Sequence, residues 1–284
     1  MNLIAIINDG TIRRLPISQD VQNELISHYN RIKENLISGR NSVKFEGNYK
    51  CEDNEIYELN EFDWKNKIKI INSNLTNVNF ENLVTLNQIN NNDIEKIKIL
   101  IIKYENYLFF QSIDNRKFIK PKSFLFYSNN TFNYVDKKGI KIDDNIDCII
   151  DLDLTSLLFT SFHNANKIFD LSDSYREATK EEIYDFMNHE TFSGELKEEY
   201  LTSTIRKKIF LITKNKILQN VNQNFHKVKE YAEQLGIDCF ANEKIEFPED
   251  KEKFKKLINF LNEDLFKSPI SDVIYETNSK KRIK

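Results

Sequence analysis

Glycine, proline and cysteine are scarce in this chain of 284 residues, which contains six, four and three of them respectively. Neither of the phosphate-cradling patterns G-x-x-x-x-G-K-[ST] and G-x-G-x-x-G occurs, which excludes nucleotide hydrolysis by those routes. The three cysteines, Cys51, Cys148 and Cys239, lie far apart and match no metal-binding or disulfide spacing. Their use is typical of a protein in a reducing cytoplasm.

Long apolar runs are also absent. None reaches the roughly 18 consecutive apolar residues of a membrane-spanning helix, and the richest, DCIIDLDLTSLLFTSF at 147–162, is interrupted by Asp151 and Asp153. The opening residues MNLIAIINDGTIRR lack the basic segment and long apolar core of a signal peptide. Hydrophobic residues make up 40% and charged residues 30%, as in folded globular proteins. We therefore expect a cytoplasmic protein with a substantial core and with neither metal nor cofactor.

The first 160 residues are predicted to be rich in β-strands. Asp9-Gly10 favours a tight hairpin, and Ser18 is expected to cap a helix with Val21 and Leu25 on its buried stripe. A strand, a turn and a second strand are expected over 42–64. From Ile94 the alternating apolar pattern predicts an antiparallel meander, with turns at Glu105-Asn106, Asn129-Asn130 and Lys138-Gly139.

After Phe162 the apolar residues take on a helical period. One predicted helix ends at Gly236, another has Pro248 in its first turn, and a short strand is expected within 269–278. The fold class is therefore α+β. Residues 1–160 form a β-rich N-terminal part with an antiparallel meander, and residues 161–284 form a mainly helical C-terminal part.

Paired carboxylates in the segment DCIIDLDLT suggest one enzymatic function. If the segment is a single strand, Asp147, Asp151 and Asp153 share one face and could hold Mg²⁺ for phosphodiester hydrolysis. The alternative is a half-buried strand whose acids lie on its solvated face. The Glu-x-Lys that a restriction-type nuclease places on the next strand is missing here. The four histidines lie in separate segments and form no zinc spacing.

The charge of the chain is unevenly distributed. Its formal net charge is −3, yet residues 201–284 contain seventeen basic and twelve acidic side chains, a net of +5. Residues 160–200 have a net of −6. Because salt screens charges beyond about 10 Å, the local field matters more to a polyanion than the total does.

Two basic segments of the last third are candidate DNA contacts. A predicted helix over TSTIRKKIFLITKNK buries Leu201, Ile205, Ile209 and Ile212, which leaves basic residues on its other side. The segment 279–284, SKKRIK, is called the basic tail below. The alternatives are a solubilising helix face and a frayed terminus. The candidate DNA-binding residues are Arg206, Lys207, Lys208, Lys214, Lys280, Lys281 and Arg282.

These residues and others resemble a known family. The ending FPEDKEKFKKLINFLNEDLFKSPISDVIYETNSKKRIK, the segment KFEGNYKCEDNEIYELNEF at 44–62 and the meander at 132–170 are similar to the KwaB-like family of the Kiwa anti-phage system. The family's domain of unknown function corresponds to about 105–284. Ser271-Asp272 departs from the Thr-Gly or Ser-Gly turn that relatives often have.

The resemblance implies a cytoplasmic bacterial defence effector that binds DNA without a known nuclease centre. It further implies a homodimer that works beside a membrane-embedded, KwaA-like sensor, with DNA contacts at Lys280, Lys281 and Arg282. Membrane association would then come through the partner protein. Three functions stay open at this point: a DNA-binding effector that blocks phage replication or transcription, a metal-dependent nuclease, and a non-catalytic scaffold that meets an acidic partner or anionic lipid.

Overall fold

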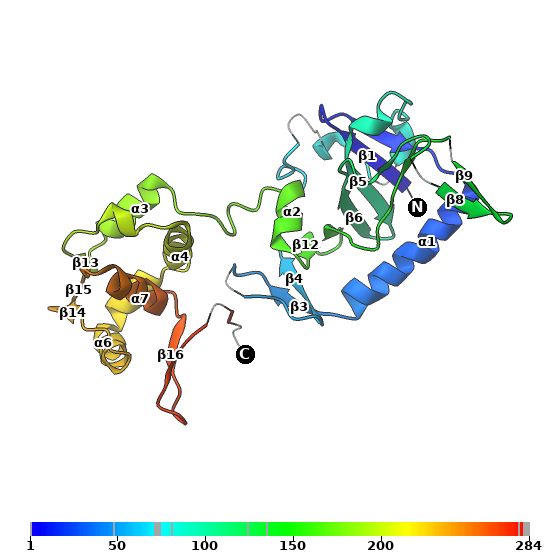
Figure 1. The fold of residues 1–284 in the computed structure, drawn as a ribbon. Helices are drawn as coiled ribbons and strands as arrows, with labels where there is room; N and C mark the ends of the chain where they lie inside the picture. Colours follow the sequence, from blue (N-terminus) through cyan, green and yellow to red (C-terminus); the bar gives the residue numbers. More distant parts are fainter. Residues whose placement is uncertain are drawn as a thin grey trace. The chain divides into compact units, whose positions relative to one another are not determined.

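The computed structural model describes residues 2–47, 49–70, 75–80, 82–123, 125–134, 136–277 and 279–280. The chain divides into two compact units, drawn as a ribbon in Figure 1. The first unit contains Met1–Phe45 and Cys51–Leu171, and the second contains Glu46–Lys50 and Ser172–Lys284. A short segment from the N-terminal half of the sequence therefore belongs to the second unit.

The first unit is built on an eight-stranded sheet with the strand order β2-β1-β5-β6-β11-β12-β4-β3. These strands are β1 (Asn2–Ile7), β2 (Ile12–Leu15), β3 (Asn41–Lys44), β4 (Glu55–Leu59), β5 (Ile97–Tyr104), β6 (Tyr107–Ser112), β11 (Cys148–Asp151) and β12 (Ser156–Phe159). Two separate two-stranded ladders join β7 (Phe118–Ile119) to β10 (Gly139–Ile140) and β8 (Leu125–Ser128) to β9 (Thr131–Tyr134). The helices are α1 (Gln19–Lys33), extended by a π-helical turn over Glu34–Ser38, and α2 (Phe162–Ile168), with 3₁₀ turns at Leu75–Asn77, Leu83–Thr85 and Ile94–Lys96.

Several local predictions for this unit are confirmed. Gly10 adopts a φ of 86° in the turn between β1 and β2, and the Ser18 side chain accepts a hydrogen bond from the Val21 amide at the start of α1. Asn129 and Asn130 have φ values of 50° and 58°, the left-handed conformation that a two-residue hairpin turn requires. The β-rich character of the N-terminal part is confirmed as well.

The sheet is covered on both faces. Strand β1 is buried from Leu3 to Ile7 without interruption, whereas a half-exposed strand would alternate. On one face α1 packs Leu25, Tyr29 and Ile32 against the sheet. Figure 1 shows this helix alongside the strands. On the other face the ring centroids of Phe110 and Phe169 lie 5.0 Å apart in a T-shaped aromatic contact. The central strands of the sheet therefore have apolar packing on both faces.

Two expectations for this unit are wrong, and the orientation of one strand pair was not predicted. The segment 147–155 is not one strand: β11 ends at Asp151, and Thr155 has a φ of 50° in the turn that leads into the antiparallel β12. Strands β3 and β4 pair in parallel, because the chain between them leaves the unit over Glu46–Lys50 before it returns. Val21 is 45% exposed, so the buried stripe of α1 begins later, at Leu25.

The second unit packs its helices around a core of its own. The helices are α3 (Lys180–Met187), α4 (Ser203–Lys214), α5 (Ile217–Gln223), α6 (Phe225–Gln234) and α7 (Lys251–Leu261), with a 3₁₀ turn at Glu198–Tyr200. Short strands lie among them: β13 (Phe192–Ser193), β14 (Phe240–Ala241), β15 (Lys244–Glu246), β16 (Leu265–Lys267) and β17 (Ile274–Glu276). The prediction of a mainly helical C-terminal part therefore fits only in part, although the expected late strand is present as β17. Helix α7 begins after Pro248, with Asp250 as its cap.

Phe109→Ala is expected to destabilise the first unit by about 3–5 kcal/mol, because the ring is fully buried and lies 5.1 Å from Tyr29. Trp64 is the one tryptophan of the sequence and is buried in this unit, so its fluorescence during urea unfolding reports on the unit. The control is Val84→Ala, at a side chain 68% exposed, which should change the unfolding free energy by less than about 0.5 kcal/mol. Equal effects of the two variants would contradict the assignment of the core.

Candidate nucleic-acid interface

Helix α4 contains four of the predicted DNA contacts. It begins after Thr202, whose side-chain oxygen accepts a hydrogen bond from the Ile205 amide at 3.4 Å. The buried side includes the predicted residues Ile205, Ile209 and Ile212 and also Phe210 and Leu211, and the predicted Leu201 is buried just before the helix. Because this buried side is wider than the predicted stripe, Arg206, Lys207 and Lys208 are each only partly exposed.

The Asp264 carboxylate joins α4 to the basic tail. One of its oxygens, Oδ2, lies 2.8 Å from Lys208 Nζ, and the other, Oδ1, lies 2.9 Å from Lys280 Nζ. Asn262 donates a further hydrogen bond from Nδ2 to Oδ2 at 2.9 Å. Asp264 is buried, and a buried charge is tolerated when it is paired and hydrogen-bonded in this way. Lys208 and Lys280, which are far apart in the sequence, are therefore held at one point.

The basic tail is fixed to the second unit as far as Lys280. The backbone amide of Thr277 donates to the carbonyl oxygen of Asp264 at 2.8 Å. The backbone amide of Lys50 donates to Ser279 Oγ at 2.9 Å, so that Glu46–Lys50 holds the tail as well. The beginning of the tail is thus an ordered part of the second unit. Lys281 and Arg282, two further predicted contacts, lie outside the described residues.

A hollow of about 220 Å³ opens beside this ion pair. Its lining consists of Gly47, Tyr175, Thr204, Lys207, Lys208, Leu211, Asn262 and Asp264. The Lys207 ammonium lies 5.9 Å from the centroid of the Tyr175 ring, a cation–π contact. Among the described residues Lys207 has no carboxylate within ion-pair distance. Lys207 and Lys208 line the hollow with Asp264, and Lys280 pairs with the same carboxylate, so these four side chains carry a formal net charge of +2.

Gly47 and Tyr175 form one wall of the hollow. Gly47 has a φ of 81°, and a Cβ atom there would lie 2.6 Å from Tyr175 Cδ2, so a larger residue would displace the ring. Burial, and to a lesser degree the negative charge of Asp264, raise the pKa of the Tyr175 hydroxyl. The hydroxyl of Tyr175 therefore stays protonated at neutral pH.

Arg206 and Lys214 are held by backbone groups of the protein. Arg206 Nε donates to the carbonyl oxygen of Leu201 at 3.0 Å. Lys214 Nζ donates to the carbonyl oxygens of Asp173 and Ser174 at 2.9 and 3.0 Å. The structure therefore brings Lys207, Lys208 and Lys280 together, while Arg206 and Lys214 lie on the same helix outside the lining of the hollow.

Asp264, Gly47 and Tyr175 were not found by sequence reasoning. Asp264 follows α7 in the ordinary polar sequence NED, and neither its spacing nor its neighbours distinguish it from the other acids. Gly47 offered a weak signal, because glycine is rare in this chain and often marks a positive φ. The role of both residues depends on contacts between segments distant in the sequence.

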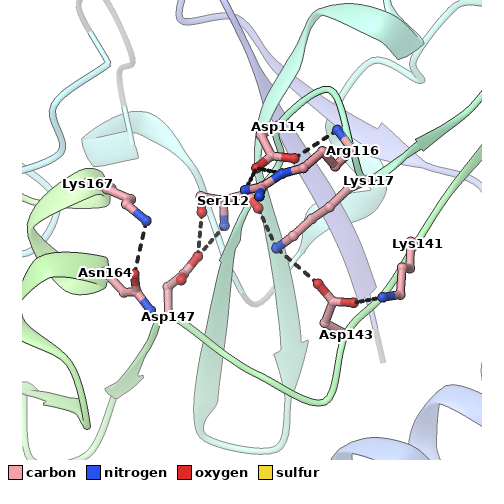
Figure 2. Close-up of polar contacts among 9 residues, drawn as sticks. All are labelled: Ser112, Asp114, Arg116, Lys117, Lys141, Asp143, Asp147, Asn164 and Lys167. Carbon is pink, nitrogen blue, oxygen red and sulfur yellow. Dashed lines mark hydrogen bonds and ion pairs between the residues drawn. The ribbon is translucent and has the colours of Figure 1, made fainter.

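The candidate nuclease carboxylates have separate partners in the first unit. Asp147 accepts hydrogen bonds from the Ser112 amide at 2.6 Å and from the Ser112 hydroxyl at 2.7 Å, which Figure 2 shows. Asp151 Oδ1 accepts from the amides of Asp153 and Leu154 in the turn after β11. Because β11 ends at Asp151, Asp153 lies in the following turn and does not share a strand face with Asp147.

The Asp153 carboxylate accepts a hydrogen bond from Asn106 Nδ2 at 2.8 Å. Across the described residues, no group of three or more His, Cys, Asp or Glu side chains is arranged to hold a metal ion. Within the same part of the chain, no helix is both long and apolar enough to cross a bilayer.

A family model described as "Kiwa protein KwaB-like" matches residues 90–271, which is more than half of the chain. The chain belongs to the KwaB-like family. Neither a curated protein nor a solved structure matches it significantly. Membership of the KwaB-like family indicates a role in Kiwa antiviral defence and interaction with other Kiwa components. The matched range includes Lys207, Lys208 and Asp264, whereas Gly47 and Lys280 lie outside it.

Asp264→Asn is expected to lower the unfolding free energy of the second unit by about 3–5 kcal/mol. The amide keeps the shape of the carboxylate but leaves the buried Lys208 ammonium without its counter-charge. Urea unfolding followed by circular dichroism at 222 nm measures the loss. The amide of Thr277, which is bonded to residue 264, should also exchange its hydrogen faster.

The matched control is Asp272→Asn. Asp272 pairs with Lys267 at 2.7 Å, but its side chain is 86% exposed, so the same change of charge should cost at most about 1 kcal/mol. If the two variants lose the same small amount of stability, Asp264 does not organise the second unit.

Proposed function

We propose that this KwaB-like protein is an anti-phage defence effector that binds DNA without cutting it and thereby blocks phage replication or transcription. The observation that supports this function best is the shared contact of Lys208 and Lys280 with Asp264. It brings Lys280, near the start of the basic tail, to the same carboxylate as Lys208 on α4. A polyanion can then meet several cations at once, which scattered lysines would not permit.

The lysines at the hollow have different parts in the proposed contact. Lys208 and Lys280 both pair with Asp264, so part of their charge offsets that carboxylate, and Lys208 is also mostly buried. Lys207 has its ammonium over the Tyr175 ring and lines the hollow, where a phosphate group can approach it. The Thr204 hydroxyl lines the same hollow and can donate a hydrogen bond to a phosphate oxygen. Lys280, Lys281 and Arg282 would extend the contact along the backbone of the DNA.

Contacts of this kind carry little sequence information. Lysine ammonium groups and a threonine hydroxyl recognise phosphates, which are the same at every base pair. The protein would therefore bind many DNA sequences with similar affinity. It would block replication or transcription by covering the DNA. Arg206 and Lys214 both donate hydrogen bonds to backbone carbonyls. They would therefore contribute to the positive electrostatic potential around α4 more than to direct contacts with DNA phosphates.

The family adds proposed partners for this activity. A membrane-embedded, KwaA-like sensor would recruit the protein in the cytoplasm, and the DNA-bound form would be a homodimer. A dimer would double the number of phosphate contacts, which is an effective route to higher affinity for a modest cationic surface.

The double variant Lys207→Gln/Lys280→Gln is expected to bind DNA more weakly and with a shallower salt dependence. Each phosphate contact contributes about −0.9 to the slope of log K against log salt concentration, so losing two should reduce the slope by about 1.8. A gel-shift titration at several salt concentrations, with DNA of unrelated sequences, measures both quantities.

The control for this experiment is Lys229→Gln/Lys253→Gln, which removes the same charge from the same unit. These lysines pair with Glu233 and Asp238 and do not line the hollow. Equal losses in the two double variants would show that net charge alone matters, and a wild-type slope near zero would reject DNA binding. Binding to an isolated membrane partner without DNA affinity would instead identify a scaffold.

Supercoiled plasmid incubated with the purified protein and Mg²⁺ or Mn²⁺ is expected to stay intact, because the Asp147, Asp151 and Asp153 carboxylates are engaged at separate points. Agarose electrophoresis detects a single cut. Cleavage that disappears in Asp151→Asn/Asp153→Asn, whose amides retain the acceptor oxygens, would overturn the non-enzymatic proposal and support a nuclease.

A further inference from the structure

A hairpin arm in the first unit is unrelated to the proposed DNA site. It consists of residues 118–140 and has two tiers. At its base β7 pairs with β10, with Ile119 opposite Gly139, and at its tip β8 pairs with β9 across the Asn129-Asn130 turn. Neither ladder is part of the eight-stranded sheet. In Figure 1 the β8–β9 ribbon (green) stands away from strands β1, β5 and β6.

One face of the tip is apolar and exposed. In the register of β8 and β9, Leu125 lies opposite Tyr134 and Tyr127 lies opposite Phe132, so all four side chains share a face. Their exposed fractions are 56%, 63%, 63% and 64% respectively. A two-stranded ribbon is marginally stable alone, and four large apolar side chains left in water on one face are a costly arrangement. The arrangement is therefore suited to a second surface that covers this face.

Lysines surround the tip. Residues 115–142 contain seven basic and one acidic side chain. Arg116, Lys117, Lys138 and Lys141 form ion pairs with carboxylates within the unit. Lys122 and Lys137, which lie between the two tiers on either side of the arm, are exposed. The arm therefore has an exposed, mainly aromatic tip, with Lys122 and Lys137 next to it along the chain. These two lysines are called the lysine collar below.

We propose that this arm binds the surface of an anionic lipid bilayer, with the aromatic tip in the interface and the lysine collar on the headgroups. Tyrosine, with an apolar ring and a hydroxyl at its end, is suited to the boundary between acyl chains and headgroups. Lysines next to such a tip complement the negative potential of anionic headgroups. The contact is peripheral, because four side chains on a ribbon reach only the outer layer of a bilayer.

The geometry favours a bilayer over unstacked nucleic-acid bases. The rings of Tyr127 and Phe132 lie 5.0 Å apart at an angle of 53°, so they pack against each other. A base would require an open ring face or a gap between parallel rings. Leu125 on the same face offers no ring at all. An apolar face with both aliphatic and aromatic side chains is better suited to lipid acyl chains than to nucleic-acid bases.

Sedimentation with vesicles tests the proposal on the full chain. Wild-type protein should bind vesicles of 30% phosphatidylglycerol in phosphatidylcholine and should bind pure phosphatidylcholine vesicles much more weakly. Tyr127→Ser/Phe132→Ser/Tyr134→Ser should lower the partition coefficient at least about tenfold. Lys122→Gln and Lys137→Gln should each lower it about fivefold, the equivalent of about 1 kcal/mol per lysine.

The chain offers a matched control in Val84→Ser/Leu154→Ser/Tyr184→Ser, which removes three side chains exposed by 68%, 63% and 67% outside the arm. This variant should sediment like wild type. The variant Lys207→Gln/Lys280→Gln should also keep its vesicle binding, which separates this proposal from the proposed DNA contact. Equal vesicle binding by the arm and control variants would overturn the proposal. So would an arm variant that loses affinity for single-stranded DNA or for a protein partner while it keeps binding vesicles.

A second measurement avoids any loss of folding in the triple variant. Tyr127→Trp places a fluorophore on the tip, and the native Trp64 is buried and gives a constant background. Anionic vesicles should shift the emission of the new tryptophan to shorter wavelength and protect it from acrylamide. An unshifted emission with full quenching on bound vesicles would place the tip in water and reject the proposal.

Discussion

A single buried carboxylate shared by two lysines determines the polar surface of the second unit. Asp264 could not remain charged in the protein interior without counter-charges, and Lys208 and Lys280 supply them from a helix and from the basic tail. The pairing therefore follows from the cost of burying charge. Its consequence for function is that Lys207, the neighbour of Lys208 on α4, lies at the same hollow and forms no ion pair of its own among the described residues.

This arrangement distinguishes lysines that are bonded within the protein, and so stabilise the fold, from lysines that can contact a ligand. A net charge of +5 over the last third suggested a continuous basic face, yet several of its lysines are bonded within the protein, such as Lys253 to Asp238 and Lys214 to backbone carbonyls. The local excess of positive charge is therefore small and concentrated. A small concentrated excess favours phosphate contacts that are few in number, which is why assembly into a dimer has a physical rationale in the proposed function.

Local chemistry made much of the fold predictable, and contacts between distant segments made the rest unpredictable. A glycine with positive φ, a serine cap and paired asparagines determine a turn or a helix start within four residues, so Gly10, Ser18 and Asn129-Asn130 could be assigned from sequence. The parallel pairing of β3 and β4 depends on the excursion of Glu46–Lys50, for which no local signal exists. The same holds for the site: its helix was predictable from apolar spacing, whereas the acceptor Asp264 was not.

The two cationic surfaces of the protein differ in the chemistry around their lysines, and this difference argues for different ligands. At the hollow of the second unit Lys207 lies with polar groups, among them a threonine, a protonated tyrosine, an asparagine and the Lys208–Asp264 ion pair, and such a hydrated polar lining suits a phosphate backbone. On the arm of the first unit Lys122 and Lys137 each lie three residues along the chain from an exposed apolar side chain, Leu125 and Tyr134 respectively, and such side chains gain free energy by leaving water. DNA offers phosphates without an apolar layer behind them, whereas an anionic bilayer offers both. Positive charge alone would not distinguish these surfaces; the side chains that accompany it do.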